Sequence, residues 1–352
     1  MNVSQLRPPY TLHKGNVLRA YSSWENPTTI ISDGAYGVRG FHGDTTGVDD
    51  LVEWYRPHVT AWEQAATPAT TLWFWNTEIG WATVHPLLVA HGWEYVQTIT
   101  WDKGISHIAG NVNGKTIRRF PVASEVSVLY QRKFMIDAAD DGPMSVKKWL
   151  RYEWQRAGLA LNKANEACGV KNAATRKYLT QDWLWYWPPG IMVERLAAYA
   201  QEYGDSKARP YYSLDGQNSV TADEWDELRY RWNHVHGLTN VWQRPSLHDS
   251  ERFKGTMNRS APRVHNPSLA SATHLNQKPL EFMERQVQAV TQEGDVVWEP
   301  FGGLASASVA AVGLGRRAFV AELDKNFQAI AEERLRGAAQ EYGSNIANEA
   351  RA

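Results

Sequence analysis

The chain has 352 residues, of which 43% are hydrophobic and 21% charged, a composition typical of a soluble globular protein with room for about two domains. It contains no apolar run of the roughly 18 residues that a membrane-spanning helix needs, and no apolar signal core between Met1 and Tyr10. We therefore expect a cytoplasmic protein with no membrane partner. The single cysteine, Cys168, excludes a disulfide framework and a cysteine-based zinc site. The histidines show no metal-ligand spacing, so we expect no metal site.

Strand and helix patterns alternate in the first third of the chain. Runs rich in β-branched and aromatic residues predict strands at residues 28–31, 70–75, 95–101 and 125–130. Apolar residues at helical spacing predict helices at residues 51–65 and 79–91. This alternation indicates an α/β fold with a parallel sheet.

The middle third changes character, and the last third returns to α/β patterns. From about Phe134, helical segments rich in Trp, Lys and Arg replace the strands, with linkers expected at residues 137–143 and 259–271. The last third predicts helices at residues 280–291, 305–314 and 326–335, strands at 296–298 and 318–321, and a glycine turn at 301–303.

Neither flank alone resembles a complete doubly wound domain. We therefore expect one α/β sheet formed from both chain flanks and interrupted by a helical insert. The expected boundaries are 1–133 for the first part of the sheet domain, 134–262 for the insert, 263–340 for the second part and 341–352 for a flexible tail.

A glycine turn follows a buried strand in the last third, as Glu299-Pro300-Phe301-Gly302-Gly303. Glycine lets the backbone approach a ligand closely. Glu322 stands at the tip of the next strand, where an acidic side chain binds ribose hydroxyls in nucleotide-binding folds. Because the GxGxxG pattern of phosphate-binding loops is absent, the stretch favours a nucleoside without phosphates. A tight turn with no ligand is the alternative.

A second group of polar residues, Asp33-Gly34-Ala35-Tyr36, ends a predicted strand. It places an acidic acceptor, a backbone carbonyl and an aromatic ring where open α/β sheets carry active sites. Taken alone, the stretch favours a plain type I turn with a surface Tyr.

In combination, these motifs resemble those of the DNA amino-methyltransferases, which use S-adenosylmethionine. The class in which the catalytic motif precedes the cofactor motif has Asp-Pro-Pro-Tyr, then Asn-Gln-Lys-Pro, then Asp-Pro-Phe-x-Gly. This chain has Asp33 to Tyr36, then Asn276 to Pro279, then Glu299 to Gly303, in that order. The stretches 101–104 and 119–132, the latter with Glu125 inside, also resemble that class. The chain departs from it by lacking both prolines, by Glu299 in place of Asp and by Ala305 in place of a glycine.

The resemblance implies a Rossmann-like methyltransferase sheet and a site for each reactant. Asp33, Gly34, Ala35 and Tyr36 would be catalytic: the Asp33 carboxylate and the Gly34 carbonyl accept the two amine hydrogens, and Tyr36 stacks on a flipped base. The leading Asp favours adenine N6 as the methylated atom over cytosine N4. C5-cytosine methylation is not expected, because it needs a cysteine nucleophile and the single cysteine, Cys168, lies in the insert, far from Asp33 in sequence. The missing prolines leave open a non-catalytic DNA-binding protein on a degenerate methyltransferase scaffold, and an enzyme of RNA or small molecules is a third alternative.

The resemblance also implies the residues around S-adenosylmethionine. Phe301, Gly302 and Gly303 would line its methionine and ribose, and Glu299 belongs to the same motif. Glu322 would take the ribose hydroxyls. Lys278 and Gln277 would hold the methionine carboxylate, and Asn16 would lie near the adenine. Enzymes of this kind are often dimers, so a homodimer is one expectation.

The helical insert carries concentrated basic charge in a chain whose net charge is −1. Between Met144 and Leu179, eight Lys or Arg stand against two Glu. Such a concentration is what binding to double-stranded DNA requires. Residues 161–170 and 171–179 have the spacing of a helix-turn-helix, which predicts DNA contacts from the second helix. Those residues are Lys171, Asn172, Thr175, Arg176 and Lys177.

A solvated basic hairpin is the alternative for this segment. The Trp-rich stretch at residues 183–189 is expected mainly to pack the helical part, although Trp can also stack on an unpaired base. Recognised DNA sequence and host role stay open, with restriction–modification, phage protection and an orphan role as alternatives.

Overall fold

The computed structural model describes residues 8–38, 44–45, 47–107, 116–138, 142–205, 209–248, 251–253 and 277–349. The chain divides into two compact units. The first contains Met1–Arg132 and Tyr230–Ala352, and the second contains Lys133–Arg229. Among the described helices, none combines the length and apolar character that crossing a membrane demands.

An eight-stranded sheet forms the first unit, in the order β1-β10-β9-β2-β3-β5-β4-β8. Strands of both chain flanks alternate in it, as expected from the sequence. The first five are parallel: β1 (Tyr10–Lys14), β10 (Arg317–Glu322), β9 (Val296–Glu299), β2 (Thr29–Ser32) and β3 (Thr71–Asn76). β5 (Ser124–Arg132) is antiparallel to β3 and to β4 (Trp93–Asp102), and β8 (Val241–Gln243) is parallel to β4.

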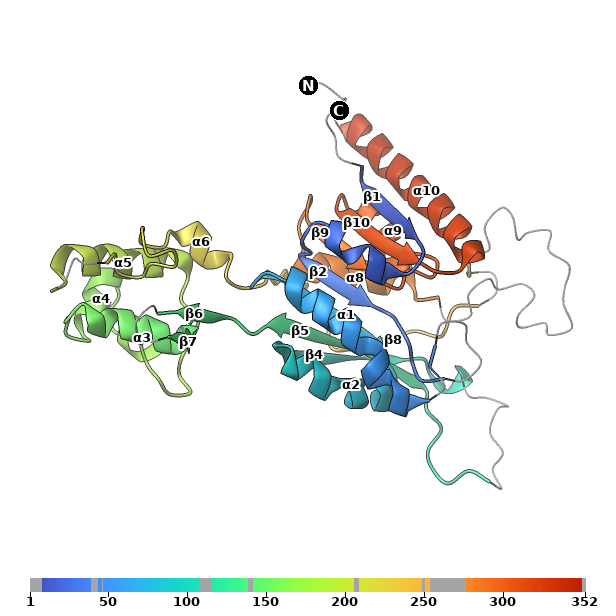
Figure 1. Ribbon diagram of the computed structural model, residues 1–352, viewed down its shortest axis with the longest axis horizontal. Coiled ribbons are helices and arrows are strands. Elements are labelled where there is room, and N and C mark those ends of the chain that lie inside the picture. Colours follow the sequence, from blue (N-terminus) through green and yellow to red (C-terminus); the bar gives the residue numbers. More distant parts are fainter. Residues whose placement is uncertain are drawn as a thin grey trace, which may run out of the picture. The chain divides into compact units, whose positions relative to one another are not determined.

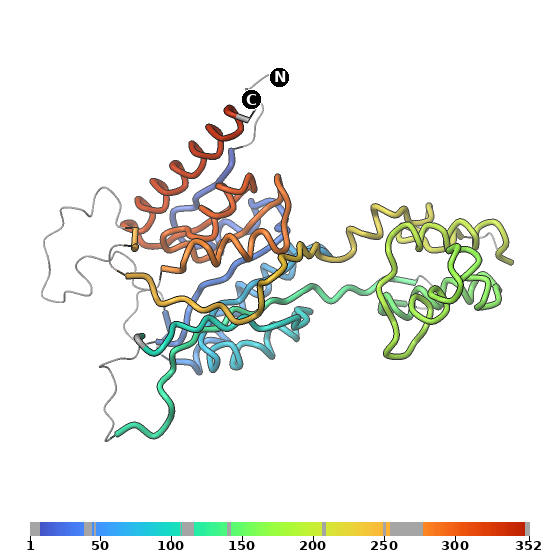
Figure 2. Tube along the Cα trace, turned by 180° about the vertical axis from the view of Figure 1, so that it is seen from behind, coloured from blue at the N-terminus to red at the C-terminus, as the bar shows by residue number. Residues whose placement is uncertain are grey.

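Every residue of β2, β3 and β9 is buried, because helices cover both faces of the sheet. α1 (Leu51–Ala65) and α2 (Glu78–Ala90) share a core with Leu72 and Phe74. α8 (Leu280–Val290), α9 (Ser306–Gly313) and α10 (Lys325–Glu349) share the opposite core with Trp73 and Trp75. The alternation within β3 follows from the two-residue period of a strand. The two helical layers can be followed in Figures 1 and 2.

Short 3-10 helices complete the first unit at Val17–Arg19, Tyr21–Ser23, Val48–Asp50 and Ile105–His107. The last helix is longer than the sequence predicted. α10 runs through residues 341–349, where we expected a flexible tail. Its extension is anchored by the Tyr342 hydroxyl, which donates a hydrogen bond to Glu293 at 2.6 Å.

The second unit is helical apart from a hairpin of β6 (Met135–Asp137) and β7 (Pro143–Ser145). The two ends of the expected linker at 137–143, Asp137 and Pro143, belong to these strands. The helices are α3 (Val146–Arg156), α4 (Lys163–Cys168), α5 (Gly190–Tyr203) and α6 (Ala222–Asp226), with a π-helical turn at Ala174–Tyr178. The unit ends at Arg229, whereas the expected insert ran to residue 262. Residues 230–248 belong to the first unit because β8 pairs with β4 there.

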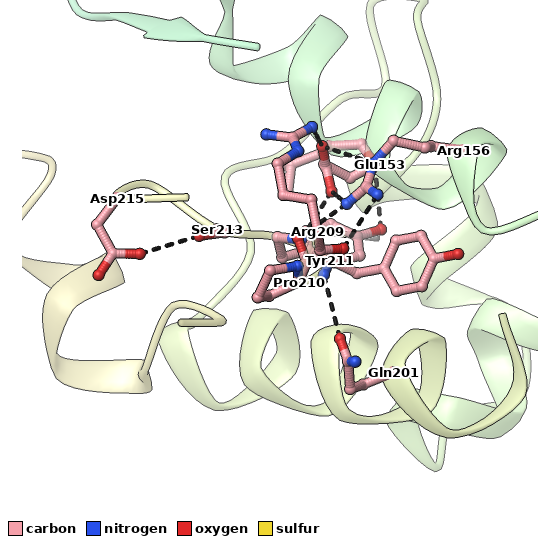
Figure 3. A network of polar contacts seen from close by, with 10 residues as sticks. Glu153, Arg156, Gln201, Arg209, Pro210, Tyr211, Ser213 and Asp215 are labelled. Atoms are coloured by element: carbon pink, nitrogen blue, oxygen red, sulfur yellow. Dashed lines mark hydrogen bonds and ion pairs between the residues drawn. The ribbon is translucent and has the colours of Figure 1, made fainter. Parts of the chain in front are cut away.

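A buried carboxylate organises the core of the second unit. Glu153 is fully buried and pairs with Arg156 at 2.6 Å and with Arg209 at 3.0 Å. It also accepts the backbone N–H of Tyr212 at 2.7 Å. A buried charge with this many partners is satisfied, and here it ties α3 to the segment after α5 (Figure 3). The expected linker at 259–271 lies outside the described residues.

Candidate active site

Most of the predicted site residues of the first unit lie at the carboxyl ends of four of its five parallel strands, while Gln277 and Lys278 precede α8. Asn16 follows β1, and Glu322 ends β10. The glycine turn follows β9, and Asp33 follows β2. The carboxyl edge of a parallel sheet is where open α/β folds bind ligands.

Asp33 lies in a cluster of charged side chains. The Tyr36 hydroxyl donates to Asp33 Oδ1 at 2.7 Å, and Lys278 Nζ lies 2.9 Å from the same oxygen. Lys278 Nζ also donates to the Tyr36 hydroxyl at 3.0 Å and lies 3.8 Å from Glu125. Lys103 pairs with Glu125 at 3.3 Å. Two carboxylates and two ammonium groups therefore balance one another around the tyrosine.

Burial and charge set the protonation states in this cluster. Lys278 is only 4% exposed. Burial lowers the pKa of Lys278, but Asp33 and Glu125 more than offset this and raise it overall. Burial, reinforced by the same two carboxylates, raises the pKa of Tyr36 well above its ordinary value. Lys278 is thus charged and Tyr36 is a neutral donor.

Buried donors hold the backbone of the Asp33 loop. The Ala35 carbonyl accepts a hydrogen bond from the Tyr55 hydroxyl at 3.0 Å and another from the Asn76 amide at 2.9 Å. Tyr55 and Asn76 are both fully buried. Because the Ala35 carbonyl accepts two hydrogen bonds from buried donors, the loop is held in place here although it has no proline.

A second anchor holds the other end of the loop. The carboxylate of Asp44 accepts the backbone N–H groups of Tyr36 at 3.0 Å, Gly37 at 2.8 Å and Val38 at 3.2 Å. Three amides converging on one carboxylate make a stable turn. Neither this anchor nor the pair Tyr55 and Asn76 was identified from the sequence, because no local spacing links them to the motif.

The two motifs, Asp33 to Tyr36 and Glu299 to Gly303, meet at Gly34. A Cβ atom on Gly34 would lie 2.7 Å from the Phe301 ring and 2.7 Å from the Tyr55 hydroxyl. Real side chains do not approach so closely, so only glycine fits while Phe301 keeps this position. The space that a proline ring would occupy is therefore filled by the cofactor motif.

The carboxylate of Glu299 accepts hydrogen bonds that fix the start of α9. Its two oxygens accept the N–H groups of Ala307 at 3.0 Å and Ser308 at 2.7 Å, at the start of α9. Burial raises the pKa of Glu299 to about 7. An acidic group at a helix N-terminus satisfies otherwise unpaired donors, so Glu299 fixes the helix that follows the glycine turn.

Glu322 joins the ends of β9 and β10. It accepts the N–H of Gly303 at 2.6 Å and the N–H of Asp324 at 2.7 Å. The Gly302 N–H donates to the Ala321 carbonyl at 2.7 Å. A Cβ atom on Gly302 would lie 2.5 Å from the Val320 side chain, which explains the glycine.

The remaining predicted cofactor residues are Asn16, beside the end of β10, and Gln277, before α8. Asn16 is exposed, and its side chain accepts the Leu18 N–H at 3.0 Å. Gln277 accepts the Phe253 N–H at 3.1 Å. Its neighbour Lys278 lies against Asp33, and its expected contact with the cofactor carboxylate stays a prediction.

The basic segment of the second unit differs from a regular helix-turn-helix. α4 has six residues, and Gly169 ends it with a left-handed φ of 66°. The second expected helix is only the π-helical turn at 174–178. Thr175 is half-buried, and its hydroxyl accepts a hydrogen bond from the Asn165 side-chain amide at 3.1 Å. Lys171, Asn172, Arg176 and Lys177 are exposed.

The Trp-rich stretch divides between core and surface. Trp185 and Trp187 pack against the core of the second unit, as expected. Trp183 is 88% exposed and does not pack there.

A family model described as DNA methylase, of the N6/N4 methyltransferase type, matches residues 2–333. The chain belongs to this DNA methylase family. The match covers both flanks and the helical unit between them, and so confirms the resemblance that the ordered motifs indicated.

Relatives within the family are distant from this chain. The Type II methyltransferase M2.DpnII of Streptococcus pneumoniae is 29% identical over 131 residues, which are 37% of this chain and 38% of that protein. The Type II methyltransferase M2.LlaDCHI of Lactococcus lactis subsp. cremoris is 28% identical over 131 residues, with the same shares. The chain thus matches well under half the length of these relatives. The solved PvuII DNA methyltransferase, described as cytosine-N4-specific, is 11% identical with a TM-score of 0.48, over 96% of this chain and 95% of that one.

Proposed function

We propose that this protein methylates an exocyclic amine of a base in double-stranded DNA, with adenine N6 as the first candidate and cytosine N4 as the alternative. S-adenosylmethionine supplies the methyl group when bound. The observation that carries the proposal is the contact between the two motifs at Gly34, which puts the Asp33 acceptor beside the glycine turn.

The residues at the glycine turn fit a nucleoside. Glu322 offers carboxylate oxygens at the end of β10, beside the N–H of Gly303. Exposed Asn16 follows the neighbouring strand β1, which pairs with β10 as far as Lys14 and Glu322. A ribose binds such an acceptor through its hydroxyls.

The chemistry explains the need for Asp33. An exocyclic amine is a poor nucleophile, because its lone pair is delocalised into the base ring. A carboxylate and a carbonyl that accept the two amine hydrogens localise that lone pair toward the methyl donor. Asp33 and the Gly34 carbonyl take these roles, and most of the rate then comes from positioning. The base has to leave the duplex to reach them, and Tyr36 stacks on it.

The first test combines product identification with one variant. Purified protein is incubated with isotope-labelled S-adenosylmethionine and whole phage genomes, and the digested nucleosides are identified by mass spectrometry. Labelled N6-methyladenine or N4-methylcytosine supports the enzyme and chooses the base. No labelled nucleoside, with cofactor binding intact by calorimetry, contradicts the proposal and favours a degenerate scaffold.

Asp33→Ala is expected to abolish transfer while DNA and cofactor binding persist. Asp49→Ala is the matched control, because Asp49 is exposed at the start of the segment leading into α1. Unchanged transfer by Asp33→Ala would contradict the role of this carboxylate.

A further inference from the structure

A cavity of about 510 Å³ lies within the second unit, between α3 and the segment that follows α4. Four of its residues come from one face of α3, at the i, i+3 and i+4 spacings of a helix. The lining comprises Met144, Lys148, Arg151, Tyr152, Gln155, Leu161, Thr175, Thr180 and Gln181. Two of these side chains are cationic and none is acidic.

Arg151 has donor capacity left over. Its Nη1 donates to the Leu179 carbonyl at 3.2 Å, which fixes the guanidinium at the cavity wall. Its Nε is buried, and no hydrogen-bond partner for it occurs among the described residues. A guanidinium carries five N–H donors, so the single hydrogen bond to the Leu179 carbonyl leaves donors of Arg151 for an acceptor that binds in the cavity.

The carboxylates on the adjoining elements are each engaged by another group. The Asp182 side chain accepts the Leu184 N–H at 2.8 Å. Glu153, on the same helix, is held by Arg156 and Arg209 (Figure 3). Glu166 pairs with Lys163 at 2.7 Å. The positive charge of Lys148 and Arg151 therefore remains available to a ligand.

The rim of the cavity is fixed to α3. The Gln181 side chain donates to the Lys147 carbonyl at 2.9 Å. Lys147 Nζ in turn donates to the Asp182 carbonyl at 2.6 Å. These two hydrogen bonds hold the segment that leads to exposed Trp183. They involve Lys147, whereas the neighbouring Lys148 is exposed.

We propose that this cavity receives a phosphodiester group of duplex DNA, held by Lys148 and Arg151. A guanidinium and an ammonium with no acidic neighbour in the lining match the charge and the acceptor geometry of a phosphate. The inference rests on the proposed function for the identity of the ligand. It goes further by placing a DNA contact on α3, beside Thr175 of the segment 171–177 that the sequence indicated.

The test measures the affinity of the full chain for duplex DNA over a range of salt concentrations. Each lost phosphate contact reduces the slope of log affinity against log salt by about 0.9. We expect Lys148→Gln to reduce the slope by about one contact, and the double variant Lys148→Gln/Arg151→Gln by about two. The loss is the same for DNA of different sequences, because a phosphate carries no base information. Arg151→Lys keeps most of the slope.

Lys163→Gln is the matched control, because Lys163 lies in the same unit, is exposed and is already paired with Glu166. Thermal unfolding checks that each variant is folded, and exposed Lys148 gives a reading even where Arg151→Gln does not fold. An unchanged slope in folded Lys148→Gln overturns the inference, as does a loss that depends on DNA sequence. Methyl transfer by the unaltered protein, measured in parallel, separates the phosphate site from the proposed function. If the protein transfers methyl groups but the variants keep its slope, only the phosphate site is overturned. If the protein neither binds duplex DNA nor transfers methyl groups, the phosphate site and the proposed function are both overturned.

Discussion

The ammonium of Lys278 lies 2.9 Å from the carboxylate of Asp33, although most of the chain separates the two residues. Lys278 stands just before α8 and is almost completely buried. It also contacts the Tyr36 hydroxyl and faces Glu125. Its side chain therefore supports the Asp33 motif, and the contact with the cofactor carboxylate that the family resemblance implies stays a prediction.

Replacing Lys278 is expected to destabilise the fold strongly. Removing one partner of a buried ion pair costs about 3–5 kcal/mol, because the other charge stays buried without its partner. We expect Lys278→Met to lower the free energy of unfolding by this amount, measured by urea denaturation. Lys14→Met is the control, since Lys14 pairs with Glu332 while 51% exposed, and such surface pairs contribute about 1 kcal/mol or less. The double variant Lys278→Met/Glu125→Gln should recover part of the lost unfolding free energy. Equal losses in Lys278→Met and Lys14→Met would contradict the role given to the buried ion pair.

The same substitution separates two roles for Lys278. If it positions Asp33, the rate of methyl transfer by Lys278→Met at saturating cofactor falls while the affinity for S-adenosylmethionine is kept. A charge-assisted hydrogen bond contributes about 1.5–3 kcal/mol, so the expected loss in rate is about 10- to 100-fold. Calorimetry gives the affinity and single-turnover assays give the rate. A large loss of cofactor affinity with an unchanged rate would return Lys278 to the cofactor carboxylate.

Gly34 is expected to tolerate no side chain. Gly34→Ala places a Cβ against the Phe301 ring and the Tyr55 hydroxyl, and overpacking of this kind costs about 1–3 kcal/mol. Gly34→Pro, which restores a residue typical of the family, meets the same two groups. We expect both variants to lose thermal stability and methyl-transfer rate. Gly47→Ala is the control, because nothing lies within 4 Å of its added Cβ. A faster enzyme from Gly34→Pro would show that the loop lacks rigidity after all.

The order of the motifs was sufficient to predict how the two flanks share a sheet. Once Asp33 and Glu322 were assigned to strand ends, their meeting at one edge followed from the geometry of parallel strands. The residues that anchor the Asp33 loop could not be predicted, because Tyr55 fits the apolar spacing of a helix and Asn76 stands at the end of a strand. Their common target, the Ala35 carbonyl, exists only in the folded chain. The sequence shows that both prolines of the family motif are missing, but the tertiary hydrogen bonds that hold the loop leave no local pattern.

Glu299 is expected to make stability depend on pH. Burial raises the pKa of its carboxyl from 4.5 to about 7, so the folded state binds more protons than the unfolded state between these values. The stability contributed by the protonated group is fully present below pH 4.5 and is lost as pH rises through about 7. The slope is at most about 1.4 kcal/mol per pH unit, and Glu299→Gln should flatten it.

Urea denaturation between about pH 5 and pH 8 measures this slope. Glu332→Gln is the control, because Lys14 lowers the pKa of Glu332 and its titration therefore falls below this window. Parallel stability curves for the unaltered protein and Glu299→Gln would show that Glu299 does not titrate there.

The tryptophans of the second unit are expected to divide by role. Trp225 is fully buried, donates to the Pro188 carbonyl at 2.8 Å and stacks on Trp149 with ring centroids 6.1 Å apart. Trp225→Ala should therefore cost about 3–5 kcal/mol of unfolding free energy. Trp183→Ala should change stability by about 0.5 kcal/mol or less, because its side chain is 88% exposed. Thermal and urea unfolding of the two variants give the comparison. A large loss of stability in Trp183→Ala would mean that this ring packs against protein in solution. A small loss would mean that the ring stays on the surface beside Gln181 at the rim of the cavity, where it can contact a ligand.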